Sequence, residues 1–451
     1  MGLVDNAGAI EWNARRSAMV AAAHNARQAA SAVAKLHDDS RRRVLFALAM
    51  NLRTSVREVV EANVRDVAAA AATLAAGQSA AGGAAGMSAA KLARLALKRE
   101  DVLQLAANCE AVANQAPVAG EITRSWTGPT GLEVRKVRTP LGVICMIYEA
   151  RPGVTIDAFA LCFKSGNAVM LKGGREAAQS NAVLGAIVQR TLREAGLPES
   201  VLTIVDTSDR ELLKVLLQQR ESIDLVIPRG GRELIEFVTE HSRIATLRHF
   251  RGVCHLYVHE SADLGLAQRL AHSGKVSAPA TCNATECLVL DAPIARALLT
   301  TLLPELTQSG VTCLLCEATI AALGPEVIAQ LDGNLVRGAE PGHFGHEFLD
   351  LTLAIRSVSG IADAIAHIGK YTSDHTEAIV ARDAGAIERF CREVRSSCVL
   401  VNASTRNNDG GALGLGAEIG ISTSRLHAYG PMGAEDLTVE RFVVVGQGQC
   451  R

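Results

Sequence analysis

The chain has 451 residues, enough for about two or three domains and a large buried core. Hydrophobic residues make up 48% and charged residues 21%, a balance typical of soluble globular proteins. The formal net charge of −1 gives no global basic field, which argues against nucleic acid or a membrane surface as a partner. Its 11 cysteines are irregularly spaced, which indicates reduced thiols in a cytosolic setting.

The first residues carry no targeting pattern. Residues 1–6 lack both the basic region and the apolar stretch of a signal peptide, and Asn6 breaks the myristoylation pattern. No stretch approaches the roughly 18 apolar residues that a membrane span needs. We therefore expect a soluble, cytoplasmic protein.

The N-terminal quarter, residues 11–112, is rich in alanine and has helical periodicity. Apolar residues recur at steps of three and four, as an amphipathic helix requires. Residues 68–86 are nearly all Ala and Gly, and four glycines interrupt the helix-favouring alanines. This segment predicts a helix end followed by a loose loop.

Residues 120–138 predict a β-hairpin. Apolar residues stand among charged ones on both sides of the turn Gly128-Pro-Thr-Gly131. Such a hairpin could be a surface ribbon or could pair with another subunit, since an exposed apolar ribbon usually needs a partner. The apolar run 440–446 predicts a further strand near the C-terminus.

Between residues 141 and 244 the pattern becomes βαβ. Apolar runs alternate with helical stretches, which predicts a parallel sheet covered on both faces. These runs are residues 141–148, 168–171, 201–205 and 223–227. Ligands bind such sheets at the carboxyl ends of the strands, where the loops 172–175 and 228–231 each carry two glycines. Glycines let the backbone approach a phosphate, and a following helix offers free N–H groups.

The most informative stretch is 277–290, where Cys282 lies between Pro279 and a short apolar strand pattern. A loop that leads into a buried strand holds a side chain rigidly and leaves one face open. A cysteine there can attack a carbonyl carbon as the thiolate. The alternative is that Cys282 is a small buried hydrophobe, like most free cysteines.

Several segments in order resemble the γ-glutamyl phosphate reductase (glutamate-5-semialdehyde dehydrogenase) branch of the aldehyde dehydrogenase superfamily. The resemblance runs from about Arg15 to the C-terminus. Cys282-Asn-Ala and Gly416-Ala-Glu-Ile-Gly-Ile-Ser-Thr423 are its most specific motifs. Further segments that carry it are 139–154, 166–174, 347–350 and 401–406.

The resemblance implies an α/β fold with a Rossmann-like nucleotide domain, an α/β catalytic domain and a small β oligomerisation arm. We expect residues 1–119 and 139–245 in the NADP-binding domain, 246–396 in the catalytic domain, and 120–138 with 397–451 in the arm and the C-terminal substrate segment. The hairpin and the last strand would then lie between subunits of a dimer or tetramer.

The resemblance also implies an activity, the NADPH-dependent reduction of L-glutamate 5-phosphate to L-glutamate 5-semialdehyde in proline biosynthesis. Cys282 would form a thioacyl intermediate, and N–H groups near Cys282 and Asn283 would stabilise the oxyanion. The chain has no room for a kinase domain, so a separate glutamate 5-kinase would supply the substrate, in possible contact with this chain. The alternatives are a CoA-acylating aldehyde dehydrogenase and a non-catalytic scaffold on the same fold.

Binding residues follow from the matched motifs. Lys172 corresponds to a lysine that contacts the adenosine ribose, and Glu347 to a glutamate that contacts the nicotinamide ribose. The predicted cofactor-binding residues are Lys172, Gly173, Arg175, Arg229, Gly230, Gly231 and Glu347. The predicted substrate-binding residues are Arg151, His375, Ser404, Thr405 and Arg406. For Arg151, His375 and Arg406 a structural salt bridge or a capped loop is the open alternative.

Three further features qualify this interpretation. Phe250 stands where oxidising aldehyde dehydrogenases carry a water-activating glutamate, which favours reduction over hydrolysis of the thioacyl group. Residues 407–413 depart from the family pattern near the substrate. Cys313-Leu-Leu-Cys316 has zinc-like spacing, but it lies in an apolar run without a second pair, so we predict a core strand and no metal site.

Overall fold

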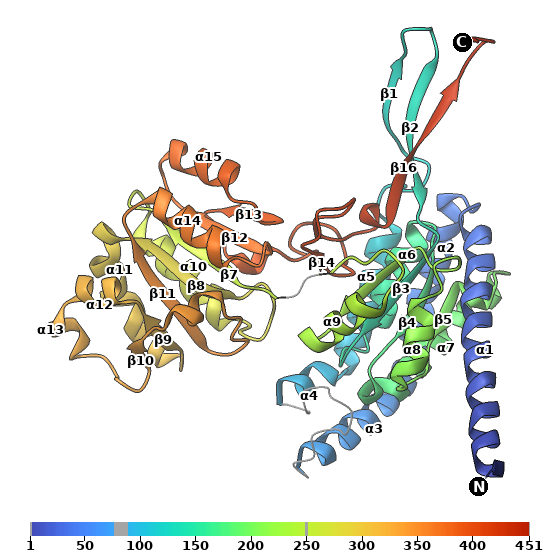
Figure 1. Ribbon diagram of the computed structural model, residues 1–451, viewed down its shortest axis with the longest axis horizontal. Helices are drawn as coiled ribbons and strands as arrows, with labels where there is room; N and C mark the ends of the chain where they lie inside the picture. Colours follow the sequence, from blue (N-terminus) through green and yellow to red (C-terminus); the bar gives the residue numbers. More distant parts are fainter. Residues whose placement is uncertain (1, 76–88, 249–250, 451) are drawn as a thin grey trace.

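The computed structural model describes residues 2–75, 89–248 and 251–450. It has two lobes and a long β ribbon that projects from one of them (Figure 1). The helices are α1 (Gly2–Val33), α2 (Asp38–Thr54), α3 (Val56–Ala75), α4 (Ala89–Leu95), α5 (Arg99–Ala113), α6 (Val154–Lys164), α7 (Ala178–Glu194), α8 (Arg210–Leu217), α9 (Arg232–His241), α10 (Leu264–Val276), α11 (Ala292–Gln308), α12 (Glu317–Leu323), α13 (Pro325–Ile328), α14 (Ile361–Tyr371) and α15 (Ala384–Glu393).

The strands complete the framework. They are β1 (Ile122–Thr127), β2 (Glu133–Pro140), β3 (Val143–Tyr148), β4 (Ala168–Lys172), β5 (Leu202–Ile204), β6 (Leu225–Arg229), β7 (Cys254–Val258), β8 (Thr285–Asp291), β9 (Thr312–Leu315), β10 (Val336–Gly338), β11 (Thr352–Val358), β12 (Thr376–Val380), β13 (Cys398–Val401), β14 (Ile421–Ser422), β15 (Gly430–Pro431) and β16 (Thr438–Val445). Short 3₁₀ helices lie at Arg175–Ala177, Glu199–Val201, Pro341–Gly345, Thr405–Asn407 and Glu435–Leu437.

The first lobe is built on a four-stranded parallel sheet in the order β5-β4-β3-β6. Every residue of β3 is buried, which explains why its sequence is apolar without alternation. Helices α2, α5, α6 and α7 pack on one face, and α1 and α8 on the other. This arrangement confirms the βαβ pattern predicted for residues 141–244. The helix predicted in residues 68–86 extends to Ala75, and residues 76–88 lie outside the described part.

The second lobe contains a seven-stranded parallel sheet in the order β10-β9-β11-β8-β7-β12-β13. Apolar clusters cover both of its faces. Cys313 is buried on β9, as predicted for a core strand, and Cys316 directly precedes α12. Strand β13 pairs with β12 although it follows the predicted domain limit at residue 396. The predicted domain boundaries are not tested by this pairing and stay predictions.

The ribbon combines two distant parts of the sequence. Strands β1 and β2 form the predicted antiparallel hairpin, and β16 pairs antiparallel with β2, from Thr438 opposite Pro140 to Val445 opposite Glu133. The ribbon stands away from both lobes (Figure 1). Within the described residues, no helix combines the length and apolarity needed to cross a membrane.

The segment after β13 runs between the two lobes and carries the short pair β14 and β15 (Figure 1). It is tied to the first lobe where Gln115 donates a hydrogen bond to the carbonyl of Leu415 at 2.6 Å. It is tied to the second where Tyr429 donates to the carbonyl of Arg395 at 2.6 Å. Residues from 402 onward can therefore contribute to a site at the junction of the lobes.

Candidate active site

Cys282 lies in the loop between α10 and β8, at one end of the seven-stranded sheet. Its thiol is free and half-buried, whereas the neighbouring Asn283 is buried. The pKa of Cys282 is raised, chiefly by burial and also by the charges of Glu418 and Glu347, while Arg229 and Arg151 partly offset this rise. The loop thus holds a thiol at the junction of the lobes, with two cations close enough to favour its thiolate form.

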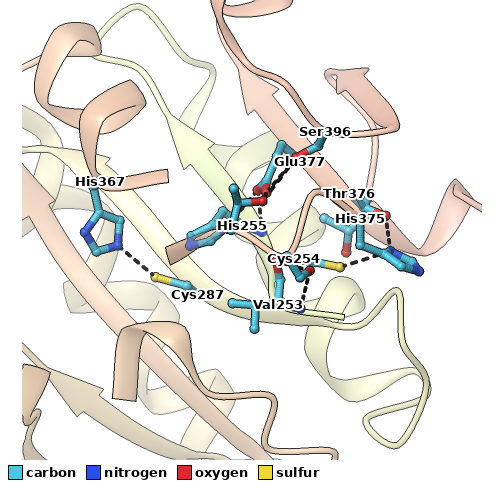
Figure 2. A network of polar contacts seen from close by, with 12 residues as sticks. Val253, Cys254, His255, Cys287, His367, His375, Thr376, Glu377 and Ser396 are labelled. Atoms are coloured by element: carbon cyan, nitrogen blue, oxygen red, sulfur yellow. Dashed lines mark hydrogen bonds and ion pairs between the residues drawn. The ribbon is translucent and has the colours of Figure 1, made fainter. Parts of the chain in front are cut away.

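The backbone of Cys282 rests on the chain just before β7. Gly252 packs so closely that a Cβ added there would overlap the carbonyl oxygen of Cys282. The thiol of Cys254 donates to the same carbonyl oxygen, with the sulfur 3.2 Å away. Cys254 in turn lies 3.6 Å from Nδ1 of His375 (Figure 2). These contacts hold the backbone of the Cys282 loop against the start of β7.

His375 is fully buried, and its Nδ1 lies 2.7 Å from the hydroxyl of Thr376. Burial lowers the pKa of His375 to about 4, so the imidazole is neutral near pH 7. The structure therefore places His375 in the layer beneath the cysteine loop. Its predicted contact with substrate stays a prediction.

Arg406 braces the cysteine loop from the C-terminal segment. Its Nη1 donates to the hydroxyl of Thr281 at 2.8 Å and to the side-chain oxygen of Asn283. The amide of Asn283 donates back to the carbonyls of Arg406 at 3.3 Å and Asn408 at 3.0 Å. The segment 407–413, predicted to depart from the family pattern, thus directly contacts the Cys282 loop through Asn408.

The other two predicted substrate residues of this segment, unlike the half-buried Arg406, are buried. Ser404 accepts a hydrogen bond from the backbone N–H of Arg406 at 3.3 Å. The hydroxyl of Thr405 lies 2.9 Å from that of Thr285, at the start of β8. Their observed contacts hold the C-terminal segment against the strand that follows Cys282, and their predicted contact with substrate is untested.

Arg151 and Arg229 bring positive charge from the first lobe. Arg151 follows β3 directly after Ala150, whose φ of 41° is unusual for a residue with a side chain. Burial and the nearby Arg229 lower the pKa of Arg151 to about 10. Within the described part of the chain, its guanidinium has no hydrogen-bond or ion-pair partner. A half-buried cation without a partner is suited to binding an anionic ligand.

Sequence reasoning missed two charged residues at this site. Glu418 lies 3.5 Å from Arg229 and accepts the backbone N–H of Gly410 at 2.8 Å. Arg94 donates to the carbonyl of Ala280, two residues before Cys282. Glu418 belongs to a motif that carried the resemblance, so its position was a usable signal. Arg94 lies in the alanine-rich helical region, where no pattern distinguished it.

Glu347 lies in the field of Arg251 and His375, and the backbone N–H of Gly252 acts against the rise of its pKa. Burial raises its pKa, and its charge acts on Cys282. Phe250, predicted to stand where oxidising aldehyde dehydrogenases carry a water-activating glutamate, lies outside the described residues. Glu347 is thus close enough to the thiol to act on its charge, and its predicted contact with the nicotinamide ribose stays a prediction.

The predicted cofactor loops lie at the ends of β4 and β6, on either side of β3. Lys172 ends β4 and is half-buried, and its ammonium has no hydrogen-bond or ion-pair partner among the residues described. Burial lowers its pKa, whereas Glu176 and Glu149 oppose this. At Gly173 an added Cβ would overlap the amide of Asn181. A partnerless cation beside backbone without a side chain fits a phosphate-bearing ribose.

The remaining predicted cofactor residues differ in their surroundings. Arg175 is exposed in the 3₁₀ helix after Gly174. Gly231 precedes α9 and donates its backbone N–H to Glu149 at 3.1 Å. Arg229, adjacent to Gly230, instead faces Glu418 and acts on the thiol. The structure therefore groups Arg229 with Arg151 rather than with Lys172.

Comparison with known proteins agrees with this geometry. A family model described as the aldehyde dehydrogenase family matches residues 9–319. A γ-glutamyl phosphate reductase from Xanthomonas axonopodis pv. citri is 47% identical over 425 residues, which are 94% of this chain and 97% of that protein. The chain belongs to the aldehyde dehydrogenase family. Its identity over nearly the whole length places it in the γ-glutamyl phosphate reductase branch, as predicted.

Solved structures of the family support the fold. A γ-glutamyl phosphate reductase from Thermotoga maritima superimposes with a TM-score of 0.87 at 35% identity, covering 96% of this chain and 99% of that one. An acetylating aldehyde dehydrogenase from Geobacillus thermoglucosidasius has a TM-score of 0.69 at 17% identity, covering 97% and 98%, and shares the fold. The predicted aldehyde-dehydrogenase-like architecture is confirmed. As a family member, the protein uses a nicotinamide cofactor.

Proposed function

We propose that the protein reduces L-glutamate 5-phosphate to L-glutamate 5-semialdehyde and releases phosphate, with NADPH as the reductant. The observation that carries this proposal is the half-buried thiol of Cys282 within the field of Arg151 and Arg229. A nucleophile flanked by two cations suits an acyl phosphate, which is an anionic and activated acyl donor. The 47% identity to a γ-glutamyl phosphate reductase supports the same substrate.

In the acylation step, the thiolate of Cys282 attacks the acyl carbon. A carbon–sulfur bond forms while the bond to the phosphate oxygen breaks, and phosphate leaves with the electron pair. Arg151 and Arg229 favour the thiolate and balance the charge of the departing phosphate. Among the described contacts, the backbone N–H groups of Cys282 and Asn283 make no hydrogen bond, so both are available to the acyl oxygen.

The cofactor is held by the first lobe. When bound, it supplies the hydride that reduces the acyl carbon. Lys172 and Arg175 bring positive charge to the phosphate-bearing ribose, which favours NADPH over NADH, and Glu347 contacts the nicotinamide ribose. Cys282 then leaves the reduced carbon as a thiolate, and the semialdehyde is released.

The polar residues that support the loop have a positioning role in this scheme. Arg406 holds Thr281 and Asn283, and His375 reaches the loop through Cys254. A loop fixed on both sides keeps the thiol in reach of the acyl carbon, because an error of about 1 Å in such geometry can cost about 10²-fold in rate.

The ribbon supports self-association into a dimer or tetramer. Its strands expose Phe442, Val444 and Val445, with Phe442 62% accessible. Exposed apolar residues on a free strand edge favour pairing with another chain. In this proposal a separate glutamate 5-kinase supplies the substrate. We also propose that this kinase contacts the protein.

The reverse reaction tests the function. Glutamate semialdehyde and NADP⁺ are mixed with and without phosphate, and NADPH formation is followed for wild type, Cys282→Ala and the control Cys398→Ala. Cys398 is another half-buried free cysteine, so its variant reports on general thiol loss. We expect phosphate-dependent activity in wild type and Cys398→Ala, and none in Cys282→Ala.

Two results would contradict the proposal. Activity without phosphate would mean that water resolves the thioester. Activity that requires coenzyme A in place of phosphate would assign the chain to the acylating aldehyde dehydrogenases.

A further inference from the structure

A second cluster of sulfur and imidazole groups lies inside the second lobe, apart from Cys282. His255 on β7 and Cys287 on β8 are paired across the parallel ladder, so their side chains lie on one face of the sheet. His367 on α14 covers that face, and its ring points at the sulfur of Cys287 (Figure 2). One ligand atom from each residue lies within 4.8 Å of the other two, and all three residues are buried.

The hydrogen bonds of His255 leave one nitrogen directed into this cluster. Its Nδ1 is 2.9 Å from a carboxylate oxygen of Glu377, so in the neutral ring Nδ1 carries the proton and Nε2 has a free lone pair. Nε2 is buried and has no hydrogen-bond partner in the described structure. Leaving such a group unsatisfied costs free energy, so the geometry calls for a ligand at Nε2.

His367 and Cys287 complete the donor set. Nε2 of His367 lies 3.7 Å from the sulfur of Cys287, and the rings of His255 and His367 meet edge to face at 5.7 Å between centroids. A neutral imidazole nitrogen is a common metal ligand. The guanidinium of Arg356 lies close enough to act electrostatically on both His367 and Cys287. The thiol of Cys316 likewise acts on Cys287.

Glu377 supplies the negative charge around the cluster. It is fully buried and also accepts hydrogen bonds from the hydroxyls of Thr372 at 2.5 Å and Ser396 at 3.1 Å. No lysine or arginine of the described chain lies within 4.0 Å of its carboxylate, and its ring partner is His255. A divalent cation would balance this carboxylate together with a Cys287 thiolate.

We propose that His255, Cys287 and His367 form a site for one borderline-soft divalent metal ion, of which Zn²⁺ is the representative. Two imidazoles and one thiolate are zinc-type ligands, and Glu377 is the carboxylate that orients a ligating histidine. Bonds of about 2.0–2.3 Å in a tetrahedron place ligand atoms about 3.5 Å apart, so the present separations of at most 4.8 Å close by up to about 1.3 Å on binding.

The site connects the parts of the lobe that carry the cysteine loop. Cys287 is two residues beyond Thr285, which anchors Thr405. Glu377 lies on β12 two residues after His375, which reaches the cysteine loop through Cys254. An ion bound here would link β7, β8 and α14, so its role is to stiffen the support of the nucleophile rather than to touch substrate.

Cobalt binding tests the proposal directly. Purified protein carrying Cys282→Ser, which removes the competing active-site thiol, is stripped with a chelator and titrated with Co²⁺. We expect one equivalent to bind with a thiolate-to-cobalt charge-transfer band. Zn²⁺ should displace the cobalt and raise Tm, and the rise should saturate at one equivalent.

Second substitutions in the same background locate the site. Cys287→Ser should abolish the charge-transfer band, whereas the control Cys254→Ser, which removes another buried thiol of the lobe, should retain it. Glu377→Gln should weaken binding roughly 10–100-fold, as loss of an orienting carboxylate does. If Cys287→Ser does not fold, His367→Asn decides, because it keeps the thiol and removes one imidazole.

Three results would overturn the proposal. The first is absence of stoichiometric cobalt binding. The second is a charge-transfer band that persists in Cys287→Ser, or persists unchanged in both His367→Asn and Glu377→Gln. The third is loss of the band in Cys254→Ser alone, which would place the ion beside His375 instead.

Discussion

Gly252 is the position where a single methyl group should uncouple the nucleophile from its support. A Cβ added there would lie 2.8 Å from Cα and 2.7 Å from the carbonyl carbon of Cys282. Optimal carbon–carbon separations are about 3.5–4.0 Å, so Gly252→Ala requires a displacement of about 1 Å. The atoms in the way are backbone, which cannot rotate aside as a side chain can.

The magnitude follows from the role of the loop. Displacing a reacting group by about 1 Å can cost about 10²-fold in rate. Overpacking of this kind costs about 1–3 kcal/mol in stability, so the protein should still fold. We therefore expect Gly252→Ala to lower kcat about 10²-fold in the phosphate-dependent reverse assay. The rate at which iodoacetamide alkylates Cys282 should change as well.

Gly369 provides the matched control. It lies in α14 of the same lobe, and a Cβ built there meets nothing within 4 Å. Gly369→Ala should keep wild-type activity and gain up to about 1 kcal/mol in stability, because alanine replaces glycine within a helix. Wild-type kcat and alkylation rate in folded Gly252→Ala would refute the reasoning about the loop.

Four further outcomes are expected. Lys172→Met should raise the KM for NADP⁺ more than 10-fold with little change in kcat, by steady-state kinetics, and an unchanged KM would remove Lys172 from the cofactor site. Arg151→Met removes a cation that lowers the pKa of Cys282, so the alkylation profile of the thiol should move to higher pH; no movement, or movement to lower pH, would contradict this. Phe442→Glu should reduce the oligomer measured by light scattering, because it places a charge in an apolar contact, and an unchanged mass would count against the ribbon as the interface. His375 has a folded-state pKa of about 4, below its unfolded value of 6.5, so its contribution to stability is complete above pH 6.5 and is lost as the pH falls toward 4. Between pH 6.5 and 5 this loss is at most about 2 kcal/mol, and guanidinium unfolding of His375→Asn should have a flatter pH dependence than wild type.

The sequence by itself determined the elements and the position of the thiol. Continuous apolar runs predicted β3, β4, β5 and β6 within a few residues, because a strand buried on both faces must be apolar throughout. The hairpin followed from alternation around a glycine turn. The cysteine between a loop pattern and a strand pattern, together with the motifs around it, sufficed to predict both fold and reaction type.

Only the tertiary structure decided which side chains meet around that thiol. Arg94 and Ala280 are 186 residues apart in the chain, and Arg406 and Thr281 are 125 apart. Local periodicity reports which face of an element is buried, but not which distant side chain packs against it. The grouping of Arg229 with the nucleophile therefore became visible only when the lobes were in place.

The His255, Cys287 and His367 cluster illustrates the same limit. Its members belong to two strands and one helix, and none has the short spacing by which metal ligands are recognised in sequence. Strand register places His255 beside Cys287, and helix packing brings His367 onto them. Both depend on interactions between distant segments, which a pattern read along one segment does not contain.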